Sequence, residues 1–596
     1  MQNEHKNTAE SIFKQHSAAE NFKAQLGNRG LYDQSKKNER FYAGDQWHGA
    51  KVSKSQPLII HNLIKRIGEY KMAVIGSAPV TANYSAEGVP NTLGMRKNID
   101  NAVNNLSSGS DINTIYGGMS EDEQLNLVMS CLSDYYDTTA ERVNFTNKCT
   151  EVMRKAFITG TGILFTYWDE YIKTGLYADE AKSAPIKGDI AIEVLDVENV
   201  DFGDPNITDI QKQPYIIIVK RRSVKEVKDA AKRYGVAKAV IDSISPDEEL
   251  DHLPGDRSET QQEGLKKCTV LLKLWKDGDT VKGIEAVKSG IVRPEWDLNI
   301  NLYPISILPW EQRTGCIYGD SEITTLIPNQ IAINRMLSAN IYSMIMNGMP
   351  IMMVNNEVLI DTPTNDPAQI VQFSGTNEDF QNAIKYINPP TFSPQISNCI
   401  NDLIQNTMSV SGANDAALGN MRPDNASAYI ALREAATTPL QLYQNRYYSF
   451  VEQVARIWCE MWIKNYGKRL LKISDESGVW YFPFDADKFR DAVISCKIDV
   501  GASTLWSEAQ VISTLDNLLA AQLITPKEYL ERLPKGVVPN SQSLIKTYAA
   551  KEETASMQQN IQKTAMQSLP PEYQAQFAQL PAEIQQQMLS NAGGTE

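Results

Sequence analysis

The chain has 596 residues, of which 42% are hydrophobic and 22% are charged, and its formal net charge is −14. A chain of this length exceeds one hydrophobic core, so we expect about two to four compact units. The negative charge argues against a protein that grips nucleic acid over a broad surface, because such affinity comes from neutralised phosphates. It still allows a protein past which nucleic acid slides.

Cysteine usage and hydropathy point to an ordinary soluble chain. The seven cysteines are scattered and show no C-x-x-C spacing, so we expect reduced thiols, as in cytosolic proteins. No apolar run follows the N-terminus, which argues against a secretory signal. The most apolar window, residues 341–354, contains Asn347 and Pro350 and is too short and too polar to span a bilayer.

The first half of the chain changes from helical to β patterning. We expect helices within 1–45, at about 57–75 and from about 120 to 157, with a short strand at 80–84 and a loop at 85–119. The strand candidates that follow are 163–168, 190–194, 215–219, 270–275 and 283–287. A capping box from Ser223 to Glu226 opens one short helix between them. This order predicts an α+β fold and not a series of βαβ units.

Two helical patterns then flank a β-rich insert. Apolar stripes predict helices at 319–347, where Pro328 starts a new helix or kinks this one, and at 394–411. The insert, 348–393, has strand-like pieces at 350–354 and 369–373. These pieces are too short for a core of their own. We therefore expect strands of adjacent subunits to complete the sheet.

The stretch that organises the rest of the chain follows. Residues 412–427 are rich in Gly, Asn and Asp and cannot form a regular element. A long helix then runs to about residue 465, and Pro439 predicts a kink within one turn. Because this helix is far longer than the globular average, we expect support from outside the subunit. Further helices are expected at 507–522, 526–532 and 540–560, before a Gln-rich tail with a repeat at Leu569 and Leu580.

The usual motifs of catalysis are missing. The sequence has no G-x-x-x-x-G-K-[ST] phosphate loop and no G-x-S-x-G elbow, and Gly160-Thr-Gly162 lacks the third glycine of a dinucleotide fingerprint. The five histidines have no zinc-ligand spacing. We therefore expect a non-enzymatic, assembling protein without metal or cofactor.

The order of these pieces resembles the portal protein, or head-to-tail connector, of tailed double-stranded DNA bacteriophages. The residues that carry the resemblance are Arg40-Phe-Tyr-Ala-Gly-Asp-Gln-Trp47, Asn62-Leu-Ile, Tyr318-Gly-Asp-Ser-Glu, Gln330, Asn334, the helix–loop–helix of 394–466, and 507–534. Together they span about 38–550. No single motif is specific, but the ordered set is.

The resemblance implies a portal-type division of the chain. The implied parts are a wing (1–318), a first stem helix (319–347), a clip (348–393), a second stem helix (394–411), a tunnel loop (412–427), a long wing helix (428–467), the C-terminal part of the wing (468–535) and a helical crown or tail (536–596).

The resemblance also implies a function and partners. Portals form a ring, usually of twelve copies, at one capsid vertex, and DNA is packaged and ejected through the central channel. The implied partners are other copies of the chain, the major capsid protein, the terminase large subunit, head-completion adaptor or tail proteins, and the passing DNA, with no membrane. The expected location is the virion, and the host cytoplasm during assembly.

Candidate site residues follow from these assignments. The DNA-facing tunnel-loop residues would be Asn414, Asp415, Asn420, Arg422, Asp424 and Asn425. The docking residues of the clip would be Asp361, Asp366, Glu378 and Asp379, and the helix kink would lie at Pro439. Arg422 either positions phosphates loosely or pairs with a neighbouring carboxylate.

Two other functions stay open. One is a different phage head-completion or scaffold ring protein without a DNA-channel role, although such adaptors are typically far shorter. The other is a nucleic-acid enzyme with a diffuse metal site.

Overall fold

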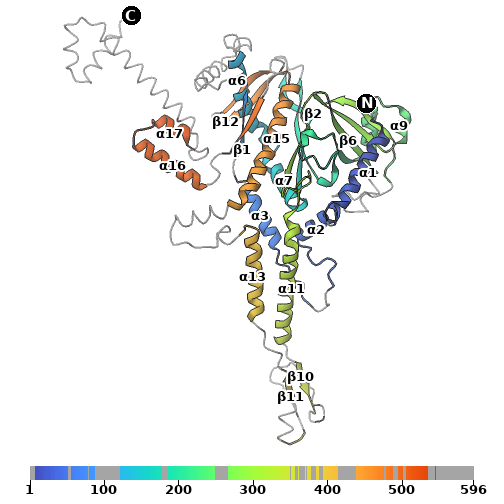
Figure 1. The fold of residues 1–596 in the computed structure, drawn as a ribbon, viewed down its shortest axis with the longest axis vertical. Coiled ribbons are helices and arrows are strands. Elements are labelled where there is room, and N and C mark those ends of the chain that lie inside the picture. Colours follow the sequence, from blue (N-terminus) through green and yellow to red (C-terminus); the bar gives the residue numbers. More distant parts are fainter. Residues whose placement is uncertain are drawn as a thin grey trace, which may run out of the picture.

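The computed structural model describes most of the chain. The described residues are 7–27, 29–51, 56–77, 80–86, 121–177, 185–247, 266–348, 351–355, 357, 360, 370, 372, 374–376, 384–387, 394–413, 438–475, 478–486, 494–500, 505–533 and 544. The described residues form both helices and strands, so the prediction of an α+β fold is confirmed at that level. A broad body carries a narrow stem that points away from it (Figure 1).

The body combines helices with antiparallel sheets. Its N-terminal helices are α1 (Ala9–Gln25), α2 (Leu31–Ala43), α3 (Leu63–Ile75), α6 (Glu121–Arg142), α7 (Phe145–Thr159), α8 (Val224–Arg233) and α9 (Lys238–Ser243). Its strands are β1 (Val80–Ala86), β2 (Thr161–Tyr177), β3 (Pro185–Leu195), β4 (Val200–Phe202), β5 (Tyr215–Ser223), β6 (Lys267–Asp277), β7 (Thr280–Val287), β8 (Gly290–Asp297), β9 (Ile305–Pro309), β12 (Lys468–Asp475), β13 (Gly478–Asp485) and β14 (Ile494–Val500).

The strands form several small sheets. The largest has the order β4-β5-β6-β7-β8, and a second has the order β3-β2-β9. All paired strands of the described residues run antiparallel, as the absence of βαβ units predicts. Strand β14 pairs with β1, with Val500 opposite Val80. This pairing joins the two parts of the chain that the sequence assigns to one wing.

A buried polar cluster anchors α1 to the largest sheet. Lys23 is completely buried, and its Nζ donates hydrogen bonds to Asp201 Oδ1 at 2.6 Å and to the carbonyl of Glu198 at 2.8 Å. His16 Nδ1 lies 2.6 Å from Asp201 Oδ2. Burial alone would lower the pKa of His16, but the hydrogen bond and charge of Asp201 outweigh it, so the pKa is raised.

Glu198 gives this anchor a pH dependence. Burial raises the pKa of the Glu198 carboxyl to about 7, and the neighbouring Asp196 adds to the effect. A carboxyl whose pKa is raised by folding stabilises the fold below its unfolded pKa, and that contribution is lost as the pH rises through about 7. We expect Glu198→Gln to raise the free energy of unfolding at pH 8 by on the order of 2 kcal/mol. Thermal unfolding at pH 8 and pH 5 tests this, with the exposed Glu69→Gln as control; equal shifts at both pH values would contradict it.

The long helix is deeply packed in the body. Of the predicted 428–467, the structure describes a 3-10 turn at Thr438–Leu440 and α15 (Gln441–Asn465). Trp458 and Trp462 of α15 are fully buried. Trp458 packs against Tyr136 and Phe145 at centroid distances of 5.2 and 5.1 Å. The expectation that this helix needs support from outside the subunit was therefore wrong for Gln441–Asn465.

Pro439 lies where the regular part of this helix begins. It belongs to the 3-10 turn at Thr438–Leu440, immediately before α15. A 3-10 turn suits this place because proline has no N–H to donate and restricts the preceding residue. Residues 428–437 lie outside the described residues, so the kink within a longer helix stays a prediction.

The stem consists of two antiparallel helices, α11 (Glu322–Gly348) and α13 (Pro394–Val410). They lie side by side below the body (Figure 1). The predictions of 319–347 and 394–411 are thus confirmed within three residues, and α11 runs through Pro328 as one helix.

A small hairpin stands at the far end of the stem (Figure 1). It pairs β10 (Ile351–Val354) with β11 (Ile384–Ile387), with Ile351 opposite Ile387. One edge of β10 is thus paired within its own chain. Of the predicted strand piece at 369–373 only residues 370 and 372 are described, so that piece and the completion of the sheet by adjacent subunits stay predictions. The candidate docking residues Asp361, Asp366, Glu378 and Asp379 lie outside the described residues.

The C-terminal part adds α16 (Leu505–Ala520) and α17 (Pro526–Arg532). Helix α17 starts with a capping box in which the side chain of Thr525 accepts from the backbone of Glu528, and Glu528 in turn accepts from Thr525. Of the predicted crown or tail, 536–596, only residue 544 is described. Among the described residues, no helix is long and apolar enough to cross a lipid bilayer.

Candidate functional site at the root of the stem

The short motifs in 40–334 that carry the family resemblance come together in space. Residues 40–47, 62–64 and 318–322, with Gln330 and Asn334, all lie where α11 leaves the body. We call this region the stem root. It contains one close approach of backbones, one buried ion pair and one ladder of hydrogen bonds.

Two glycines let the backbones of the stem root touch. A Cβ added to Gly319 would lie 2.4 Å from the carbonyl oxygen of Gly160, and a Cβ added to Gly160 would lie 2.4 Å from the carbonyl oxygen of Gly319. Real Cβ atoms do not approach so closely, so both positions need glycine. The N–H of Gly319 donates to Thr161 Oγ1 at 2.8 Å. The glycine of the Tyr318-Gly-Asp-Ser motif is thus required by packing.

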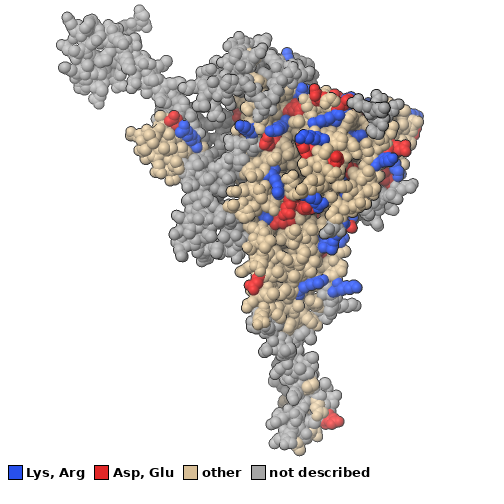
Figure 2. All heavy atoms as spheres, viewed as in Figure 1, with Lys and Arg blue, Asp and Glu red and all other residues tan. Residues whose placement is uncertain are grey.

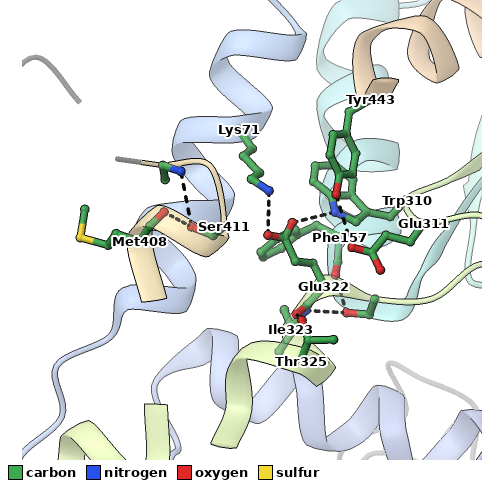
Figure 3. Close-up of polar contacts among 12 residues, drawn as sticks. Lys71, Phe157, Trp310, Glu311, Glu322, Ile323, Thr325, Met408, Ser411 and Tyr443 are labelled. Atoms are coloured by element: carbon green, nitrogen blue, oxygen red, sulfur yellow. Dashed lines mark hydrogen bonds and ion pairs between the residues drawn. The ribbon is translucent and has the colours of Figure 1, made fainter. Parts of the chain in front are cut away.

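A buried carboxylate starts α11. Glu322 is 5% exposed; its Oε1 accepts from Lys71 Nζ at 2.7 Å and its Oε2 from Trp310 Nε1 at 3.0 Å. Lys71 also lies 4.9 Å from the centre of the Tyr443 ring. Figure 3 shows these side chains converging from α3, α11, α15 and the segment after β9. A carboxylate in the first turn also suits the positive end of the helix dipole.

A second carboxyl group lies beside this pair. Tyr443 OH donates to Glu311 Oε1 at 3.3 Å. Burial raises the pKa of the Glu311 carboxyl, and the charge of Glu322 raises it further. Arg446 of α15 donates to the carbonyl of Trp310. Helix α15 is therefore tied to the stem root by polar contacts as well as by its aromatic residues.

An extended segment, which we call the strap (56–63), runs along α11. The N–H groups of Ile59, His61 and Leu63 donate to Ser338 Oγ at 3.1 Å, Asn334 Oδ1 at 3.0 Å and Gln330 Oε1 at 3.0 Å. The three acceptors are four residues apart on one helix face, and the donors are two residues apart. Four helical residues rise about 6 Å and two extended residues about 6.6 Å, so the two periods match.

The side-chain amide N–H groups of Gln330 and Asn334 in this ladder are hydrogen-bonded as well. Gln330 Nε2 donates to the carbonyl of His61 at 2.6 Å, and Asn334 Nδ2 donates to Gln46 Oε1 at 2.5 Å. Both side chains are at most 3% exposed. Leaving one such buried group without a partner costs about 1–3 kcal/mol. Gln46 and Asn334, both quoted for the resemblance, thus meet directly.

A side-chain hydrogen bond joins the two stem helices. Asn329 Nδ2 of α11 donates to Thr407 Oγ1 of α13 at 3.2 Å. Above this bond α13 ends in a tight turn, where the N–H of Ala413 donates to the carbonyl of Met408 at 3.0 Å. Ser411 Oγ donates to the same carbonyl at 2.8 Å (Figure 3). Gly412 in this turn has φ 75°, which glycine adopts without strain.

The chain returns to this turn after residue 437. A Cβ added to Gly412 would lie 3.6 Å from Cβ of Pro439, so the two ends of 414–437 are neighbours. The candidate DNA-facing residues, Asn414, Asp415, Asn420, Arg422, Asp424 and Asn425, lie in this segment, outside the described residues.

A pocket of about 350 Å³ lies beside the stem root. Three arginines line it, and each has a partner: Arg313 pairs with Asp320, Arg456 with Glu452, and Arg446 with the carbonyl of Trp310. Among the described residues, no group of three or more His, Cys, Asp or Glu side chains could hold a metal ion. The charged groups here hold the structure together.

Sequence reasoning found part of the stem root. Gln330 and Asn334 were quoted for the resemblance, whereas Ser338, Lys71 and Trp310 were missed. The polar residues that recur every four positions in this helix, at 330, 334 and 338, were the available signal.

The comparisons with known proteins returned no relatives: no protein-family model matches the chain, and no curated protein matches it.

Proposed function

We propose that the chain is the portal subunit of a tailed double-stranded DNA bacteriophage. Copies of it, usually twelve in this class, would form a ring at one capsid vertex through which DNA is packaged and ejected. The ring would dock the terminase large subunit and head-completion adaptor or tail proteins, and contact the major capsid protein. Its place would be the virion, after assembly in the host cytoplasm.

The observation that carries the proposal is the stem root. Two helices project from a large body and end in a small two-stranded sheet, and α11 is fixed at its base in part by residues that carry the resemblance. A subunit that forms one part of a channel wall must hold its stem at a constant angle to its body. A buried ion pair, a ladder of three hydrogen bonds and two touching backbones meet that need.

Three further features agree with the proposal. The net charge of −14 suits a channel that must not hold DNA, since each neutralised phosphate would raise the barrier to sliding. The energy source would be the separate terminase, which agrees with the absence of a phosphate loop. The stem is the feature that needs neighbouring subunits. Helix α15 does not need them, because it is packed inside its own subunit.

The segment 414–437 provides the functional test. Because Gly412 and Pro439 are neighbours, a short Gly-Ser linker in place of 414–437 should leave the fold and assembly unchanged. We expect phage carrying this variant to assemble heads but to lose packaged DNA by at least tenfold, as measured by protected genome in purified particles.

A matched replacement controls for the loss of a segment. The N–H of Asp247 donates to the carbonyl of Lys267 at 3.2 Å, so the ends of 248–265 are also close. The same linker there should leave both assembly and packaging unchanged. If the 414–437 variant packages DNA at the wild-type level, the assignment of the tunnel-loop residues within it to the channel is wrong.

A further inference from the structure

The described stem helices carry very few charges. The charged residues of α11 are Glu322 and Arg335, and that of α13 is Asp402. Glu322 is buried in the ion pair with Lys71. Arg335 and Asp402 are exposed, and neither side chain pairs with another described residue. Two opposite charges therefore stand alone on a largely apolar and amide-bearing stem.

The two charges lie at the same height on the stem. The hydrogen bond between Asn329 and Thr407 gives both helices a common level. Arg335 is six residues beyond Asn329 on α11, and Asp402 is five residues before Thr407 on the antiparallel α13. At about 1.5 Å per residue, they lie about 9 Å and about 7.5 Å from that level, in the same direction.

The two charges point to opposite flanks. At about 100° per residue, Arg335 is turned about 120° away from the direction in which Asn329 meets α13. Asp402 is turned about 140° away from the direction in which Thr407 meets α11. Arg335 therefore lies on the α11 flank and Asp402 on the α13 flank. Because both helices are right-handed, the two side chains are also turned toward the same side of the plane that contains the two helix axes. Figure 2 shows acidic atoms on the α13 side of the stem and basic atoms on the α11 side.

Exposed apolar side chains lie nearer the tip of both stem helices. Met344 and Ile345 of α11 are 55% and 47% exposed, and Ile396 of α13 is 39% exposed. A closed ring needs two different surfaces that complement each other, one on each flank of every subunit. The flanks of this stem meet that requirement in charge and in height.

We propose that neighbouring copies of this chain pack stem against stem, with Arg335 of one copy paired with Asp402 of the next. This proposal rests on the proposed function, because it takes the occupant of each flank to be a second copy in a ring. The pair sets the vertical register between neighbours. One such pair would recur at every interface of the ring.

Charge reversal tests the pairing in the purified full chain. We expect Arg335→Glu or Asp402→Arg to lower the ring fraction at least threefold at low NaCl concentration, because like charges then face each other at every interface, and we expect this loss to shrink as NaCl screens the charges. The double variant Arg335→Glu/Asp402→Arg should return to the wild-type ring fraction. Lys225→Glu, an exposed reversal on α8, controls for the change in net charge. Mass photometry over a salt series measures the ring fraction.

Cross-linking tests the head-to-tail arrangement. Cys399 is the exposed cysteine of the described residues, so the background is Cys399→Ser. With a short bismaleimide, Arg335→Cys/Asp402→Cys should give a ladder of covalent multimers that ends at the ring size. Either single cysteine should give monomers.

The possible results distinguish a failure of the Arg335–Asp402 pairing from a failure of the ring itself. A ring fraction at low NaCl concentration that is unchanged by the single reversals, or not restored by the double variant, would overturn the pairing and leave the ring intact. Dimers from a single cysteine would overturn the head-to-tail contact. A wild-type chain that forms no ring would overturn the proposed function itself.

Discussion

Lys71→Met is expected to lower the free energy of unfolding by about 3–5 kcal/mol. The change removes the partner of Glu322 and leaves a buried carboxylate with the Trp310 N–H as its remaining side-chain donor. Lys71 is 3% exposed, so water cannot replace its ammonium group without opening the stem root. Urea unfolding followed by far-UV circular dichroism, at one fixed protein concentration, measures the effect.

Two variants show whether the buried charge is the cause. The double variant Lys71→Met/Glu322→Gln keeps an acceptor for Trp310 but removes both charges, and we expect it to recover more than half of the loss. Lys65→Met removes a lysine from an exposed ion pair with Glu69, which is worth about 0–1 kcal/mol. If Lys71→Met is as stable as Lys65→Met, the ion pair does not hold the stem root.

Gly160→Ala is expected to have an effect of similar size. Gly160 has φ 93°, so alanine would be strained by about 1–2 kcal/mol. Its Cβ would also lie 2.4 Å from the carbonyl oxygen of Gly319. Because that neighbour is backbone, α7 must move away from the start of α11, which adds about 1–3 kcal/mol. The thermal midpoint should therefore fall markedly.

Gly278→Ala is the matched control. Gly278 also has a positive φ, of 63°, but a Cβ there meets nothing within 4 Å. It reports the backbone strain alone. We expect Gly160→Ala to be less stable than Gly278→Ala, and equal thermal midpoints would show that the close approach of the two backbones is not required.

The sequence predicted elements whose pattern is local. The apolar stripe of 394–411 defines α13 to within one residue, and the alternation and turn signals located β2, β5 and β6. The same patterns led to the wrong expectation that α15 needs support from outside the subunit. Trp458 and Trp462 were visible, but their partners Tyr136 and Tyr84 lie more than three hundred residues away along the chain. Helical periodicity does not show which distant segment covers a face.

The stem root was predictable only in part for a related reason. Gln330, Asn334 and Ser338 mark a polar ridge, but the ridge alone does not name the strap, which lies more than 260 residues earlier. The need for glycine at Gly160 and Gly319 likewise arises from one contact between two distant turns. The candidate residues of the tunnel loop and clip lie in segments that the structure does not describe, so they stay predictions.

The most direct test of the portal proposal is negative-stain electron microscopy of the purified full chain, with its mass measured in the same buffer. The account predicts closed rings with a central channel, with the stems gathered around one end of it and the bodies forming the wider part. Monodisperse monomers at micromolar concentration, or open filaments without a channel, would contradict it.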